Sequence, residues 1–264
     1  MATPTTTPSA LLADAAFGAQ PQLWPLPQAQ NSHQRWLRAV AAGGQGYYGI
    51  AFAELDEIIR QGRDEPTTAL AYSTRASFLR QLGGHRTARR WDGRALVSAG
   101  PDLQARADAM VGLAADALGV GRLAASARLL QRAAGDSGVP RQSVRRHWVS
   151  AELAMVSADG PASIDHAERA VHEADTLGSV RHRAKSQVVL AAALCCTGDL
   201  SAARRVADSV FALTAEFGLV PLHWAVGCLL ADIGSAGGSA ADIAAARDLA
   251  AETIRNRGGV WSRH

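Results

Sequence analysis

The sequence predicts an all-α fold, a right-handed superhelix of about six helical hairpins. Residues 186–218 show one hairpin clearly, because two apolar runs with helical periodicity flank a Thr-Gly-Asp turn. In that turn, Gly198 can end the first helix, and Asp199 or Ser201 can cap the second. The composition agrees with this fold class: 48% of the residues are hydrophobic but only 5% are aromatic, which favours closely packed, alanine-rich helices.

The spacing of this hairpin recurs along the chain. A turn glycine is followed five residues later by an alanine at Gly46 and Ala51, Gly83 and Ala88, Gly119 and Ala124, and Gly198 and Ala203. The residue twelve positions before each alanine is also small: Ala39, Ala76, Gly112 and Ala191. Two further copies have a longer turn: Gly160 with Ala167, and Gly238 with Ala246. Two correlated columns of small residues predict stacked two-helix repeats.

These motifs resemble those of the tetratricopeptide repeat (TPR) family. Gly112, Ala124 and Ala95 supply small residues of the family pattern, and Pro101, Pro140 and Pro221 supply its prolines. Repeat lengths of 36 residues and more exceed the family's usual ~34, which is similar to the TPR-like domains of bacterial regulators and signalling proteins. The resemblance covers about residues 32–255 and implies a superhelix whose first helices line a concave groove.

We divide the chain into three segments. Residues 1–32 are rich in Pro, Ala and Thr and are predicted to be a flexible arm, residues 33–255 form the repeat domain, and residues 256–264 form a tail. The tail is either a frayed end or a cap on the last apolar surface. The arm contains an apolar Leu-Trp-Pro-Leu-Pro stretch at 23–27, which is either a docking motif or, as we favour, a strap packed on the first hairpin. No signal peptide or membrane span is indicated, so we expect a cytoplasmic protein.

The first unit, residues 33–62, has predicted helices near 33–42 and 50–60. Its Gly-Gly-Gln-Gly turn is a tight interhelical turn rather than a phosphate loop, because no strand precedes it and no Lys-Ser or Lys-Thr follows. The second unit spans residues 67–97 and the third spans 103–134. The fourth unit begins at Arg141, the fifth begins at Arg181, and the sixth spans 221–255. In the second unit, Arg86, Arg89, Arg90 and Arg94 share one helix face, which we interpret as solvated.

The fourth and fifth units begin with cations in the first turn of a helix. Positive charge there opposes the helix dipole, at a cost of roughly 0.3 to 1 kcal/mol per charge. Two interpretations stay open: an anion-facing rim of the superhelix, or exposed positions filled by the arginine-rich sequence of a GC-rich bacterial genome. The residues of this rim are Arg141, Arg145, Arg146, Arg181 and Arg183.

Charge and motifs narrow the classes of function. A net charge of +3 is compatible with an acidic partner but lacks the dense basic stripe of a nucleic-acid-binding protein. Cys195, Cys196 and Cys228 form neither a disulfide framework nor a metal-binding pattern, and we interpret them as buried, inert core residues. No catalytic or nucleotide-binding motif is present, so we expect no enzyme activity, no cofactor and no metal.

The resemblance to TPR proteins also implies where a partner binds. Counting from the small residue of each first helix places aromatic, polar and charged side chains on the concave wall: Trp36, Ser73, Ser77, Arg80, Arg106, Asp116, Trp148 and Lys185. Trp36 and Trp148 have an alternative role as core residues, which we favour. Lys185 matches one basic position of the chaperone-binding members, but alanine and serine stand where their asparagines are expected, so the sequence does not support that ligand.

The sequence therefore predicts a non-catalytic interaction module that binds a peptide or partner helix in a concave groove. One alternative is a regulator or sensor that restrains a transcription or signalling factor through the same groove, and another is an enzyme with an unrecognised site. The identity of the partner, a small ligand of the groove and the oligomeric state stay open.

Overall fold

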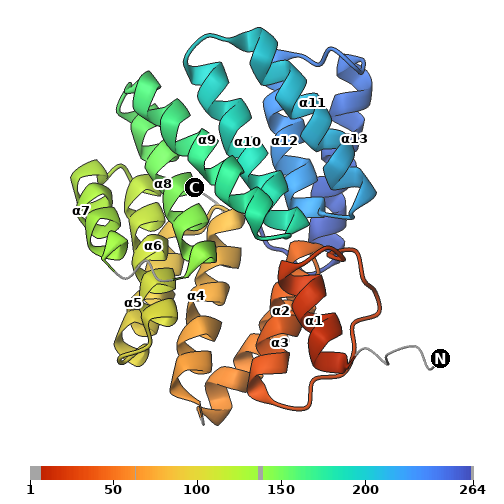
Figure 1. Cartoon of the computed structure of the whole chain (residues 1–264). Helices are drawn as coiled ribbons and strands as arrows, with labels where there is room; N and C mark the ends of the chain where they lie inside the picture. Colours follow the sequence, from red (N-terminus) through yellow and green to blue (C-terminus); the bar gives the residue numbers. More distant parts are fainter. Residues whose placement is uncertain (1–6, 63, 136–138, 263–264) are drawn as a thin grey trace, which may run out of the picture.

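The protein is an array of helices that curves into a ring. The computed structural model describes residues 7–62, 64–135 and 139–262, which contain 13 helices and no strand (Figure 1). The predicted all-α superhelix is confirmed. Helix α1 spans Pro8–Phe17, and the six hairpins that follow are α2 (Ser32–Gly44) with α3 (Tyr48–Gln61), α4 (Glu65–Gln81) with α5 (His85–Ser98), α6 (Leu103–Gly119) with α7 (Leu123–Ala134), α8 (Pro140–Val156) with α9 (Gly160–Thr176), α10 (Val180–Cys196) with α11 (Leu200–Glu216), and α12 (Val220–Ile233) with α13 (Ala240–Asn256).

Short polar side chains cap many of these helices. Asp102 accepts a hydrogen bond from the Ala105 amide (2.7 Å), and Asp199 accepts one from the Ala202 amide (2.9 Å). Each such cap stabilises a helix start by about 1 kcal/mol. The predicted turn of the fifth hairpin is therefore confirmed, with Gly198 in the left-handed region (φ 88°) immediately before the cap.

Two columns of small residues hold the hairpins together, and every member is fully buried. In the first five hairpins the columns are Ala39, Ala76, Ala114, Ala151 and Ala191 on the first helices, and Ala51, Ala88, Ser126, Ser163 and Ala203 on the second helices. Small side chains at these positions let the helix axes approach each other closely. The predicted columns are therefore correct in the first, second and fifth hairpins.

The predicted register of the third hairpin is wrong by two residues. Gly121, with φ of 75°, forms the turn, whereas Gly119 still belongs to α6. The column residues are consequently Ala114 and Ser126, and the predicted Ala124 is exposed. Gly112 is small for another reason, because a Cβ atom there would collide with the carboxylate of Asp92.

The fourth hairpin departs from the prediction in a similar way. Ala158, with φ of 58°, takes the turn position, and Gly160 is the first residue of α9. The column residue five positions after the turn is therefore Ser163, while the predicted Ala167 is also buried, about one helical turn further on.

The N-terminal segment is ordered, so the predicted flexible arm is wrong for residues 7–31; residues 1–6 lie outside the described part. Helix α1 buries Leu12, Ala15 and Ala16 against the core of the first hairpin. The amide of Val180 donates to the carbonyl of Gly18 (3.1 Å), which ties the end of α1 to the start of α10. Helix α1 therefore closes one side of the ring.

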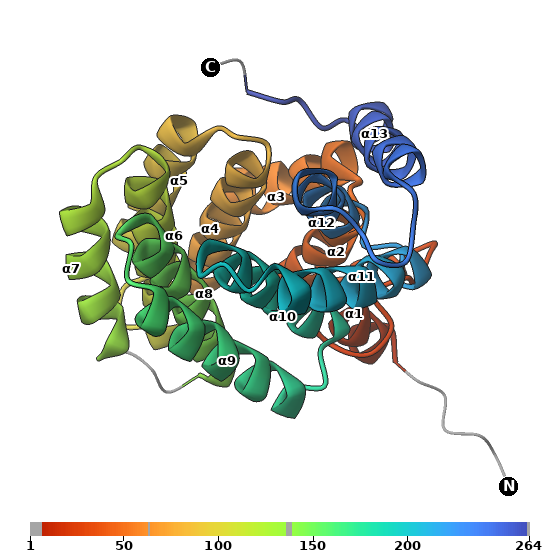
Figure 2. The same ribbon diagram turned by 90° about the horizontal axis from the view of Figure 1, so that it is seen from above.

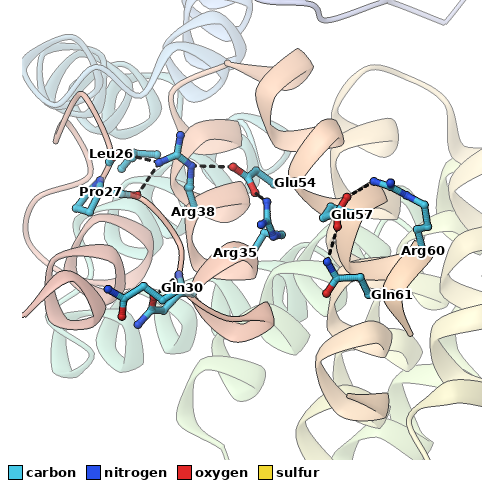
Figure 3. A network of polar contacts seen from close by, with 10 residues as sticks. Leu26, Pro27, Gln30, Arg35, Arg38, Glu54, Glu57, Arg60 and Gln61 are labelled. Carbon is cyan, nitrogen blue, oxygen red and sulfur yellow. Dashed lines mark hydrogen bonds and ion pairs between the residues drawn. The ribbon is translucent and has the colours of Figure 1, made fainter. Parts of the chain in front are cut away.

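The favoured interpretation of residues 23–27 as a packed strap agrees with the structure. Trp24 stacks on Tyr47 with ring centroids 4.0 Å apart. Arg38 donates to the carbonyls of Leu26 (2.8 Å) and Pro27 (2.6 Å) and pairs with Glu54 (2.8 Å), so one guanidinium holds the strap against α3 (Figure 3).

The C-terminal segment joins the last hairpin to the first two (Figure 2). The amide of Gly49 donates to the carbonyl of Arg257 (2.9 Å), and the amide of Ser262 donates to the carbonyl of Leu82 (2.8 Å). The Arg257 guanidinium lies 4.0 Å from the centroid of the Tyr47 ring. We call residues 257–262 the clasp. The tail was predicted to be either a frayed end or a cap. Its described part is a cap, which contacts both the last hairpin and the first two hairpins.

The cysteines differ from their predicted environment. Cys196 is exposed and Cys195 and Cys228 are half-buried, so none of them is a core residue. Partial burial raises the pKa of the Cys196 and Cys228 thiols, which lowers their reactivity. Within the described residues, no helix is both long and apolar enough to span a bilayer.

Candidate binding cavity

The ring encloses a cavity of about 450 Å³. Its wall comes mainly from the first helices of the hairpins, α2, α4, α6, α8, α10 and α12, with contributions from α1 and the clasp. A volume of this size is within the range of small-ligand pockets. The predicted arrangement, with first helices inside and second helices outside, agrees with this wall.

The cavity wall follows the repeat. Positions three residues before and one residue after the small residue of a first helix lie on one face, because helical side chains three to four residues apart are neighbours. In the first four hairpins these positions are Trp36 and Val40, Ser73 and Ser77, Val111 and Ala115, and Trp148 and Glu152, all of which line the cavity.

Most of the predicted groove residues come together at this wall: Trp36, Ser73, Ser77, Arg80, Trp148 and Lys185. Arg106 and Asp116 do not line the cavity. Both were counted from Gly112, and a shift by two residues to the true column residue, Ala114, gives Asp108 and Leu118, which do line it. The error in register therefore explains both misplaced residues.

Arg80 is part of a buried charge network. Its Nε lies 2.8 Å from Asp116 Oδ1, its Nη2 contacts the Asp92 carboxylate, and Nη2 also donates to the carbonyl of Gly112 (3.1 Å). Burial raises the pKa of Asp92 to about 8; Arg80 opposes the increase and Asp116 adds to it. Arg80 is thus fixed to the wall by two carboxylates.

The two predicted tryptophans both line the cavity and pack within the protein. Trp36 is buried and donates through Nε1 to Thr74 Oγ1 (2.8 Å). Trp148 donates to Ser186 Oγ (2.8 Å), and its ring lies beside His182 with centroids 5.5 Å apart. Since their polar atoms are satisfied internally, these rings offer the cavity mainly apolar surface.

Lys185 is paired across the cavity wall. Its Nζ lies 3.2 Å from Glu152 Oε1 and 6.0 Å from the centroid of the Trp148 ring. The pair joins α10 to α8 and is partly exposed to the cavity, so the two charges largely neutralise each other there.

The predicted cationic rim divides into two groups. Arg141, Arg145 and Arg181 line the cavity, whereas Arg146 and Arg183 do not. Arg141 and Arg145 both pair with Asp108, the former at 2.6 Å. Burial lowers the pKa of Arg141, Arg145 and Arg181 to about 10 in each case, so all three stay cationic at neutral pH.

Several lining residues lie outside the first helices of the hairpins. Three of them are aromatic, Phe17 from α1, Tyr48 from α3 and Trp261 from the clasp, and His85 from α5 and Ile254 from α13 line the cavity as well. Tyr48 donates its hydroxyl to Gln81 Oε1 (2.8 Å), and burial raises its pKa. In the sequence, the only sign of a role for these three aromatic residues is that they are apolar and lie outside the predicted helices. Their place in the cavity depends on closure of the ring.

The wall combines aromatic surface with guanidinium groups, a set suited to an apolar ligand that carries negative charge. Within the described residues, no group of three His, Cys, Asp or Glu side chains could hold a metal ion.

Comparisons with known proteins bear on the fold. No family model matches the chain, and no curated protein matches it. A similar solved structure is that of the Rap conjugation gene regulator of the plasmid pLS20 in complex with the Phr* peptide, with a TM-score of 0.65 and 12% identity over 92% of this chain and 68% of that chain. At this identity the likeness supports the TPR-like helical-repeat architecture.

Proposed function

We propose that the protein is a non-catalytic regulator that binds a short peptide, or a segment of a partner protein, inside the ring. The observation that carries the proposal is that all six first helices line one cavity, which offers aromatic surface and cationic groups together. Interfaces of this kind derive most of their binding energy from buried aromatic and arginine contacts.

The structural comparison supports the same proposal. The Rap regulator was solved with a peptide bound, and its architecture is similar to that of this chain. In our proposal, the bound segment changes the shape or the exposed surface of the ring, and a second protein responds to that change. A regulator of this kind needs neither a cofactor nor a metal.

A variant that fills the cavity tests the proposal. Ala115 lines the cavity from the α6 wall, so Ala115→Phe should occupy ligand space while the helices keep their packing. Ala124→Phe is the matched control, because Ala124 is exposed on the outer helix α7. Binding is measured by fluorescence anisotropy with labelled hexapeptides first selected on an array with the unaltered protein.

We expect Ala115→Phe to weaken peptide binding at least tenfold, or by about 1.4 kcal/mol, and Ala124→Phe to leave it unchanged. Equal affinities of the two variants would show that peptides bind elsewhere. An array without any bound peptide would rule out the proposed function.

A further inference from the structure

One end of the cavity holds more positive than negative charge. Arg141 in the first turn of α8, Arg145 one turn later and Arg181 in the first turn of α10 converge there, and Asp108 from α6 is the carboxylate that pairs with two of them. Three guanidinium groups thus lie at this end of the cavity, and the carboxylate there pairs with two of them. We call these four residues the arginine cluster.

Arg181 is the member without an anionic partner. Among the described residues it makes no ion pair, and its Nε is buried without a hydrogen-bond partner. Its neighbours fix its position: Gly44 at the end of α2 leaves room for its side chain, and its guanidinium lies 5.8 Å from the centroid of the Phe17 ring. Arg181 as a whole is half-buried, and a cation that is removed from water without an anionic partner lowers the stability of a fold unless an anion compensates it.

The Phe17 ring contacts two of the cations. Arg141 lies 5.0 Å from the centroid of the same ring, so two guanidinium groups share one aromatic side chain. Their positions in the first turns of α8 and α10 add the positive ends of two helix dipoles, which also favour an anion. Helix α1 therefore completes this end of the cavity.

A second unpaired donor lies in the same wall. Trp261 Nε1 of the clasp is buried without a partner, while the Trp261 ring packs on Trp224 with centroids 4.4 Å apart. Unpaired buried donors are rare in folded proteins. With the Ser73 hydroxyl, which also has no hydrogen-bond partner among the described residues, three buried donors belong to residues of the cavity wall. The wall therefore has hydrogen-bonding capacity that the protein does not use itself.

We propose that the arginine cluster binds a carboxylate group of the ligand through Arg181 and Arg141, while the aromatic wall holds the ligand's apolar part. This inference rests on the proposed function, because it takes the ligand of the cavity to be a peptide. The carboxylate can belong to the peptide C-terminus or to an Asp or Glu side chain.

The first test uses a small probe in place of a peptide. Benzoate and benzamide have the same shape but differ in charge, and each is added at constant ionic strength while the thermal midpoint is measured. We expect benzoate, but not benzamide, to raise the midpoint of the unaltered protein. Arg181→Gln should abolish the shift, and Arg183→Gln, two residues further along α10 and outside the cavity, should preserve it.

Arg181→Gln should itself fold, because it removes a half-buried charge that has no anionic partner. Arg181→Lys keeps the charge and should retain part of the benzoate shift. A benzoate shift that persists in Arg181→Gln, or equal shifts with benzoate and benzamide, would overturn the proposal.

The second test uses the best hexapeptide from the array in its free-acid form, as its C-terminal amide, and with Asp and Glu changed to Asn and Gln. We expect loss of the critical carboxylate to weaken binding about tenfold and to show which source it has. Arg181→Gln should remove this difference. Peptides that bind the protein and Arg181→Gln equally would overturn this inference but keep the proposed function. A benzoate shift without any bound peptide would keep the carboxylate site but not the peptide.

Discussion

The buried guanidinium of Arg80 is stabilised by the carboxylates around it. Arg80 lies against two buried carboxylates, Asp92 and Asp116, and the Asp92 carboxylate occupies the space that Gly112 leaves free. Arg80 lines the cavity at the predicted groove position, and its ion pairs give it a structural role as well. Removal of a guanidinium from such a network leaves unpaired buried carboxylates, which typically costs about 3–5 kcal/mol.

Asp92 makes stability depend on pH. The pKa of a free aspartate is about 3.9, whereas in the folded chain it is raised to about 8, mainly by burial. Because the folded state holds the proton more tightly, this group stabilises the fold fully below the unfolded pKa. That contribution is lost as the pH rises toward 8, at no more than ~1.4 kcal/mol per pH unit.

We therefore expect the thermal midpoint of the unaltered protein to fall, relative to that of Asp92→Asn, between about pH 5 and 8. The asparagine can still accept a hydrogen bond from Arg80 but cannot become charged. Asp248→Asn is the control: the pKa of the exposed Asp248 is lowered by its hydrogen bond to Arg247, so its difference should be small and of opposite sign. Parallel pH curves for the unaltered protein and Asp92→Asn would contradict the assignment.

At the scale of the helix, the close approach of paired helices rests on small side chains. Ala203→Leu inserts three carbon atoms at a fully buried position of α11 and should destabilise the protein by about 1–3 kcal/mol through overpacking. Ala212→Leu, at an exposed position of the same helix, should have little effect. Thermal melts of the two variants measure the difference, and a larger loss for Ala212→Leu would show that the helix is rotated.

The sequence predicted the hairpins well because caps, turns and apolar periodicity are local. It predicted the cavity wall only where the register was correct. In the third hairpin, Gly119 and Gly121 were both reasonable turn residues, and the choice of Gly119 moved the wall from Asp108 and Leu118 to Arg106 and Asp116. Gly112 reinforced the error, because a glycine that makes room for Asp92 cannot be told in sequence from one that lets helices pack.

Contacts between distant segments were beyond the reach of such reasoning. The segment that forms helix α1 was predicted as flexible because residues 1–32 are rich in Pro, Ala and Thr, and its burial depends on a surface formed by α2 and α10. The same holds for Trp261, whose place in the cavity requires the last hairpin to meet the first.

At the scale of the whole molecule, the clasp determines whether the array is open or closed. The backbones of Gly258 and Gly49 approach so closely that a Cβ atom at Gly258 would lie 2.8 Å from Gly49 Cα. We expect Gly258→Ala to open the ring, which would lower the thermal midpoint and increase the radius of gyration in X-ray scattering.

Gly198→Ala is the matched control, because Gly198 has the same φ of 88° but no atom near the position of the added Cβ. Both variants bear the cost of an alanine in the left-handed region, about 1–2 kcal/mol. The additional loss of stability in Gly258→Ala, relative to Gly198→Ala, therefore measures how much the clasp contact stabilises the protein. An equal loss and an unchanged radius in both would show that the ring does not depend on this contact.

Closure of the ring also changes how the protein unfolds. In an open repeat array each unit contacts only its neighbours, so the end units have one exposed flank and exchange their amide hydrogens most readily. Here Ile254 of the last hairpin is buried in the apolar core of the first, and Tyr47 of the first hairpin stacks with Arg257 of the clasp. The first and last hairpins thus cover each other's exposed flanks. We therefore expect the protein to unfold in a single cooperative transition, which begins when the contacts between these two hairpins break, rather than by fraying from its ends.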